Sequence, residues 1–187
     1  MAKEIRFFNV QQFGRDFGTL NLNPGKKVYG ERLIQHGGKE YRTWDIYRSK
    51  IAAAIEHGLQ NFPFKENTKI LYLGAGNGTT VSHFSDVCTQ GQIFAVEFSA
   101  RSAIDLFMLA KQRKNIVPLL ADANHLLSYL AIAPEVDVIY QDIAQRDQTR
   151  TVAVSEILSA FFPRIFFKRR NDFLPRVLGQ HGADQHK

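Results

Sequence analysis

The chain is poor in the features that build disulfides, metal clusters and membrane spans. Cys88 is the single cysteine among 187 residues, which excludes an internal disulfide and a zinc site made of cysteine ligands. No apolar run reaches the roughly 18 residues of a transmembrane helix, and the N-terminus lacks the apolar core of a signal peptide. We therefore expect a protein of a reducing, cytoplasmic compartment, without a metal site and without membrane contact.

Acidic residues are outnumbered by basic ones. Lys and Arg total 24 against 18 Asp and Glu, so the net charge is +6. Arg42, Arg48 and Lys50 lie close together in the sequence, and a second basic run occupies residues 168–170. This excess favours a polyanionic partner such as RNA or DNA, with a simple contribution to solubility as the alternative.

The order of predicted elements indicates an α/β protein. Residues 1–45 show strand and turn signals without a helical period, including a hairpin turn at 36–38. Predicted helices and strands then alternate, which is typical of a doubly wound parallel sheet. The strands are expected at 69–73, 92–96, 116–120 and 136–140, and the helices at 49–59, 79–88, 100–112, 124–131 and 147–161. We divide the chain into a small N-terminal β domain (1–45), a Rossmann-like domain (46–162) and a divergent, irregular tail (163–187).

A glycine-rich segment carries the clearest functional signal. The apolar run 70–73 leads into three closely spaced glycines and then into a predicted helix. In such a loop the backbone N–H groups can approach a nucleotide-like ligand at a helix N-terminus. The spacing is not the Gly-x-Gly-x-x-Gly of dinucleotide enzymes, which disfavours NAD without excluding it. The glycines are Gly74, Gly76 and Gly78, and they are followed by Thr79 and Thr80, which either cap the helix or bond the ligand.

Three carboxylates follow predicted strands at the same edge of the sheet. Glu97, Asp122 and Asp142 lie within two residues of the ends of the second, third and fourth parallel strands. Because the carboxyl ends of parallel strands meet at one edge, we expect these side chains to lie beside the glycine loop. Glu97 can accept hydrogen bonds from two ribose hydroxyls, and Asp122 can accept one from an adenine amine. Asp142 can face a cation near the reacting atom. The edge is therefore predicted to bind a nucleoside-like cofactor.

Several collinear motifs resemble archaeal fibrillarin. They are LNPG at 22–25, EYRTWD at 40–45, LYLG at 71–74, GTT at 78–80, AVEFS at 95–99, NIVP at 115–118 and DIAQ at 142–145. The resemblance implies a methyltransferase fold and an S-adenosylmethionine-dependent RNA ribose 2′-O-methyltransferase. It also implies a box C/D guide RNA, a Nop-domain scaffold protein and a kink-turn-binding protein as partners, with rRNA or tRNA as the target, in an archaeal cytoplasm.

The resemblance further implies roles for individual residues. Lys50 and Asp142 match two members of the family's catalytic Lys-Asp-Lys-His set, in which the lysine would favour a developing alkoxide and the aspartate would orient it. The cofactor contacts would be Thr79 and Thr80 at its methionine end, Glu97 and Phe98 at ribose and adenine, Asp122 and Ala123 at adenine, and Asp142, Ile143, Ala144 and Gln145 beside the methyl group.

The resemblance stops near residue 162. The family's fifth strand with its lysine, and the closing hairpin with its histidine, are not found in 163–187, for which we favour a reading-frame accident or truncated copy over a divergent ending. Missing strands would expose Val136, Val138 and Ile139 on a sheet edge and predict low stability and aggregation. Two alternative functions follow: a catalytically impaired copy that still binds cofactor or scaffold, and, on weaker grounds, an NAD-dependent oxidoreductase.

Overall fold

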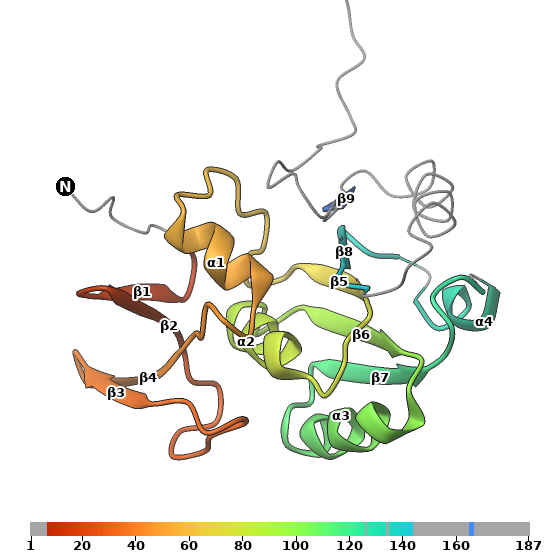
Figure 1. Ribbon diagram of the computed structural model, residues 1–187, viewed down its shortest axis with the longest axis horizontal. Helices are drawn as coiled ribbons and strands as arrows, with labels where there is room; N and C mark the ends of the chain where they lie inside the picture. The colour runs from red at the N-terminus through yellow and green to blue at the C-terminus, as the bar shows by residue number, and fades with distance from the viewer. Residues whose placement is uncertain (1–6, 126, 134, 144–164, 167–187) are drawn as a thin grey trace, which may run out of the picture.

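The computed structural model describes residues 7–125, 127–133, 135–143 and 165–166, which form two sheets (Figure 1). The N-terminal sheet is antiparallel, with strand order β1-β2-β4-β3, and the second sheet is parallel, with order β7-β6-β5-β8-β9. In Figure 1 the helix α2 (Thr79–Val87) lies between the two sheets. Within the described ranges, no helix has the length and apolar character needed to cross a membrane.

The N-terminal sheet consists of two hairpins. Its strands are β1 (Val10–Phe13), β2 (Asp16–Leu20), β3 (Leu33–His36) and β4 (Lys39–Thr43). The turn between β3 and β4 contains Gly37 and Gly38, both with positive φ, as a tight two-residue hairpin turn requires. This confirms the hairpin predicted at 36–38. The boundary drawn between residues 45 and 46 stays a prediction.

The parallel sheet follows the predicted alternation of strands and helices. Its elements are α1 (Lys50–Glu56), β5 (Lys69–Leu73), α2, β6 (Gln92–Glu97), α3 (Ala100–Gln112), β7 (Ile116–Leu120), α4 (Leu127–Leu130), β8 (Val138–Gln141) and β9 (Ile165–Phe166). The expected fold class, a doubly wound parallel sheet with a small N-terminal β element, is confirmed. The helix predicted at 124–131 is shorter, and the one predicted at 147–161 lies outside the described residues, as does most of the tail.

The central strand β5 explains why its sequence is an unbroken apolar run. Ile70 and Tyr72 pack into one core cluster, and Leu71 and Leu73 pack into a second cluster on the opposite face. A parallel strand that is covered on both faces needs apolar side chains at every position. The chain runs from β5 outward to β7 and then returns to β8 on the other side of β5. This reversal creates the crevice at which doubly wound sheets bind ligands.

The expectation that β8 forms an exposed edge of the sheet is wrong. Val136, Val138 and Ile139 are all buried, and β8 pairs in parallel with β9 through Ile139 and Ile165. Side chains of a strand point to the faces of the sheet rather than to its edge, so core packing covers them. Val138 packs in one cluster and Ile139 in the other. The predicted low stability therefore loses its stated cause.

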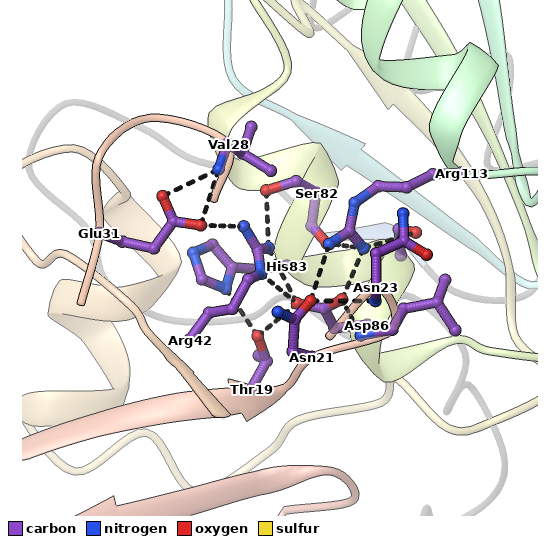
Figure 2. A network of polar contacts seen from close by, with 12 residues as sticks. Thr19, Asn21, Asn23, Val28, Glu31, Arg42, Ser82, His83, Asp86 and Arg113 are labelled. Atoms are coloured by element: carbon purple, nitrogen blue, oxygen red, sulfur yellow. Dashed lines mark hydrogen bonds and ion pairs between the residues drawn. The ribbon is translucent and has the colours of Figure 1, made fainter. Parts of the chain in front are cut away.

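A buried polar network joins the N-terminal sheet to α2 (Figure 2). Asp86 of α2 accepts from Arg42 Nε at 2.8 Å, from Arg113 at 2.5 Å and from the Thr19 hydroxyl at 2.7 Å. Arg42 also forms an ion pair with Glu31. The four ionised side chains are 0–1% exposed, and their charges balance. The network fixes α2 against the N-terminal sheet.

This network changes the interpretation of the basic residues. Arg42 was expected in a basic cluster for a polyanion, but it is fully buried and neutralised. Arg48 pairs with Asp45, and Lys50 pairs with a carboxylate of the parallel sheet. The cluster at 42–50 is therefore not a continuous surface patch.

Candidate cofactor and catalytic site

The glycine loop begins where β5 ends and brings the ends of three strands together. The backbone N–H groups of Gly74 and Ala75 donate to Val96 O of β6 at 2.9 and 3.0 Å. Gly74 has φ +83°, and a Cβ there would lie 2.9 Å from the backbone oxygen of Asp142. Glycine at this position therefore permits the close approach of the β5 and β8 ends. The position of Asp142 depends on it.

The helix α2 starts directly after the loop. Its N-cap is Gly78, with no side-chain cap, so the interpretation of Thr79 and Thr80 as caps is wrong. Both threonines lie in the first turn, where backbone N–H groups lack partners within the helix. The Thr79 hydroxyl donates to Asn77 Oδ1 at 3.1 Å, whereas the Thr80 side chain is buried. Thr79 is thus placed toward the loop and Thr80 toward the protein interior.

Glu97 follows β6 and holds the glycine loop. Its Oε2 accepts from Gly76 N at 2.7 Å, and its Oε1 accepts from Ser99 N at 2.8 Å. Each oxygen retains a second lone pair, which could accept from a ribose hydroxyl. The next side chain, Phe98, is 67% exposed. The carboxylate is therefore preset in orientation, and a free aromatic surface lies beside it.

Asp122 and Ala123 follow β7 next to this position. Ala121 N donates to Glu97 O at 3.1 Å, which sets the end of β7 beside that of β6. Asp122 Oδ1 accepts from the backbone and side-chain nitrogens of Asn124, both at 2.9 Å. Ala123 is buried, and its carbonyl accepts from another buried side chain, Tyr129. Asn124 is a supporting residue that sequence reasoning missed.

Lys50 and Asp142 form an ion pair although they are 92 residues apart in the sequence. Lys50 is the first residue of α1, and Asp142 directly follows β8, with its N–H donating to Leu73 O at 2.9 Å. The side chains are 39% and 16% exposed, so the pair is accessible from solvent. Ile143 lies against Gly74. The predicted cofactor contacts Ala144 and Gln145 lie outside the described residues.

Tyr72, which the sequence predicts only as part of a buried strand, is a further residue at this site. Its hydroxyl donates to Asp142 Oδ2 at 3.4 Å. Burial raises its pKa well above 10, and the charges of Tyr140 and Asp142 add to the effect. It therefore remains a neutral donor. A hydroxyl in an otherwise apolar strand is the signal that could have identified it.

A surface pocket of about 590 Å³ lies away from these strand ends, against the N-terminal sheet. Two of its arginines, Arg32 and Arg48, are already paired with Asp16 and Asp45. The strand-end carboxylates do not line it. We therefore place the candidate site at the carboxyl edge of the parallel sheet and not in this pocket.

The fold defines the class of this chain as a Rossmann-like α/β protein. Its glycine loop and the acidic residues at its strand ends are typical of a site for a nucleoside-like ligand. The family model described as Fibrillarin matches residues 2–162. The chain therefore belongs to the fibrillarin family. The match ends where the motifs stop, so the predicted departure near residue 162 is confirmed.

Curated relatives support this membership. The chain is 52% identical over 132 residues to the fibrillarin-like rRNA/tRNA 2′-O-methyltransferase of Methanothermobacter thermautotrophicus, covering 71% of this chain and 59% of the relative. It is 51% identical over 148 residues to a protein of the same name from Methanosarcina mazei, covering 78% of this chain and 75% of the relative. The chain thus spans about three fifths of the length of the first of these relatives.

Solved structures show the same architecture. Aeropyrum pernix fibrillarin with natively bound S-adenosyl-L-methionine matches with a TM-score of 0.75 and 38% identity, over 87% of this chain and 74% of that one. Fibrillarin in a complex with Nop5p matches with a TM-score of 0.74 and 39% identity, over 86% and 71% of the two chains. These similarities confirm the predicted Rossmann-like methyltransferase fold.

Proposed function

We propose that this chain is an S-adenosylmethionine-dependent RNA ribose 2′-O-methyltransferase that modifies rRNA and tRNA in a guide-RNA particle. The observation that carries the proposal is the Lys50–Asp142 ion pair, which lies beside the Gly74 loop at the ligand-binding edge. The names of the curated relatives support it. The activity, the substrates and the partners are all part of the proposal, because the chain spans 59% of the first relative.

The residues at the edge fit S-adenosylmethionine. Glu97 offers an oriented carboxylate for the ribose, and the exposed ring of Phe98 offers a surface for adenine. Asp122 and Ala123 would meet the adenine edge, and Thr79 and Thr80, in the first turn of α2, would meet the methionine end. Ile143 borders the loop, and Ala144 and Gln145 complete the proposed contacts beside the methyl group. The cofactor, when bound, supplies an electrophilic methyl group on a sulfonium.

The Lys50–Asp142 pair can assist the attack of a ribose hydroxyl. The oxygen of a 2′-hydroxyl would bond to the methyl carbon as the bond from that carbon to sulfur breaks, and the hydroxyl proton would leave to solvent, so negative charge develops on the oxygen during the attack. The Lys50 ammonium can stabilise this charge, and its 39% exposure lets an RNA strand reach it. Asp142 holds the lysine in place and adds a negative charge that complements a sulfonium. Alignment of the two reacting atoms supplies a further part of the rate.

The partners follow from the same family. A relative of this chain was crystallised with Nop5p, which supports a Nop-domain scaffold protein as a partner here. We further propose a box C/D guide RNA, a kink-turn-binding protein and a target rRNA or tRNA, in the cytoplasm of an archaeal cell. The guide RNA would select the target nucleotide.

Cofactor titration provides the first test. We expect isothermal titration to show binding of S-adenosylmethionine and none of NAD. Glu97→Gln should weaken cofactor binding about tenfold, because a charge-assisted hydrogen bond contributes roughly 1.5 kcal/mol. Glu56→Gln, an exposed carboxylate at the end of α1, serves as the control. Binding of NAD in preference to S-adenosylmethionine would refute the proposal and favour an oxidoreductase.

Methyl transfer in a reconstituted guide-RNA complex provides the second test. Lys50→Ala and Asp142→Ala should each lower the rate about 100-fold, as expected for removal of a group that stabilises the transition state. Lys39→Ala on the N-terminal sheet should leave it unchanged. A wild-type chain that binds the cofactor but transfers no methyl group would instead support the impaired-copy alternative.

A further inference from the structure

We infer that Tyr72 is a positioning residue for the Lys50–Asp142 pair. The inference rests on the proposed function, because it assigns Tyr72 a role at the same site. It adds a residue to that site that acts through Asp142 and that touches neither the cofactor nor the RNA.

The two carboxylate oxygens of Asp142 have different partners. Lys50 Nζ contacts Oδ1, and the Tyr72 hydroxyl donates to Oδ2 at 3.4 Å. The backbone N–H of Asp142 is also held, by Leu73 O at 2.9 Å. A carboxylate with a separate donor on each oxygen cannot rotate without losing one of them. Tyr72 thus sets the direction in which Asp142 presents Oδ1 to Lys50.

The hydroxyl of Tyr72 is held in place because its ring cannot move. Tyr72 is 1% exposed, and its ring lies 4.8 Å from that of Tyr140 and 5.9 Å from that of Phe84. Tyr72 is also directly opposite Tyr140 in the register of β5 and β8. Close packing of this kind fixes a single rotamer. The donor is therefore rigid, unlike a group carried on a loop.

A readout that does not require activity is hydrogen exchange of the Lys50 ammonium group, followed by lysine-selective NMR. In the wild type we expect slower exchange at Lys50 than at the exposed Lys39. Tyr72→Phe keeps the ring and should raise the Lys50 exchange rate about threefold to tenfold, the range that corresponds to one lost hydrogen bond. Asp142→Asn should raise it more. Adding Tyr72→Phe to Asp142→Asn should then have no further effect, because Tyr72 acts through Asp142.

Tyr140→Phe is the matched control. Tyr140 is buried in the same aromatic cluster, but it is the Tyr72 hydroxyl that donates to Asp142 Oδ2. We expect its Lys50 exchange rate to stay within about twofold of the wild type. An equal rise in both variants would overturn the inference, because loss of any buried hydroxyl would then suffice. An unchanged rate in Tyr72→Phe would also overturn it.

Kinetics separate this inference from the proposed function. In a wild type that transfers methyl groups, Tyr72→Phe should lower kcat about tenfold while the KM for S-adenosylmethionine stays within about twofold. A changed KM with an unchanged kcat would overturn the positioning role. A wild type that transfers no methyl group would contradict the proposed function, and the exchange measurements would still decide the role of Tyr72.

Discussion

Asp86→Ala removes the carboxylate that two buried guanidinium groups share. Asp86 accepts from Arg42, from Arg113, from the Thr19 hydroxyl and from Leu22 N. Without it, Arg113 keeps only neutral acceptors among its hydrogen-bond partners in the described part of the chain. Breaking a buried ion pair by removing one partner costs about 3–5 kcal/mol, so we expect a loss of about 4 kcal/mol. That is a large share of the roughly 5–15 kcal/mol by which a typical domain is stable.

Urea unfolding followed by tryptophan fluorescence measures this loss. Trp44 is the single tryptophan, and it stacks on His83 of α2 with ring centroids 4.7 Å apart and an interplanar angle of 14°. His83 also contacts the Thr19 hydroxyl at 2.8 Å, so the fluorophore lies against the network. Its emission should therefore report separation of α2 from the N-terminal sheet.

Asp16→Ala is the control for this prediction. Asp16 also pairs with an arginine, Arg32, but the two side chains are 56% and 63% exposed. An exposed pair contributes about 1 kcal/mol or less, so this variant should unfold near the wild-type midpoint. Asp86→Asn keeps the side-chain volume and loses the charge, so its urea midpoint should lie between those of the two alanine variants. If Asp86→Ala and Asp16→Ala lower stability equally, the argument from burial is wrong.

Three further outcomes follow from the same structure. Gly74→Ala should lower stability by about 1–3 kcal/mol and weaken S-adenosylmethionine binding, because the added Cβ meets the Asp142 backbone. Gly14 has φ +65° and no atom near an added Cβ, so Gly14→Ala should lower stability through backbone strain alone and leave cofactor binding unchanged. Equal effects of the two variants in thermal melts and cofactor titrations would contradict the role of the Asp142 contact. Burial alone would raise the pKa of Glu31, but two backbone amides and a buried guanidinium outweigh it and lower that pKa below 4.5. Glu31 therefore contributes stability that is present above pH 4.5 and lost as the pH falls through the folded pKa. The urea midpoint of the wild type should fall at acid pH, and Glu31→Gln should make this fall smaller. An unchanged fall would contradict the assignment of this pH dependence to Glu31. Burial raises the pKa of Cys88 to about 12, so a thiol reagent should label it only when urea opens the fold. Rapid labelling of the native protein would show that this helix end opens locally.

The parallel sheet was predictable because its signals are local. The buried run 69–73 and the helical period at 100–112 match β5 and α3 without any shift. α4 spans only four residues where eight were expected, since residues 124 and 125 precede the helix after a turn that is fixed in part by the hydrogen bond between Asp122 and Asn124. A carboxylate that bonds the backbone two residues on favours a turn over a helix.

The buried network was not predictable in the same way. Arg42 is separated from Asp86 by 44 residues, and Arg113 from Asp86 by 27. Nothing in the local sequence around Arg42 distinguishes a buried arginine from one on the surface. For that reason the sequence favours a basic cluster at 42–50 that would bind a polyanion. Only the packing of α2 against β2 and β4 reveals which charges pair.

The sequence by itself determined the class of fold, the glycine loop and the acids at the strand ends, because strand periodicity and turn chemistry act over a few residues. The sequence motifs also point to the fibrillarin family. Only the tertiary structure decided which of these residues meet. It brings Lys50 to Asp142, places the Tyr72 hydroxyl beside Asp142, and pairs β8 with β9 from the tail. These contacts join segments far apart in the chain, and their formation depends on how sheets and helices pack around one core.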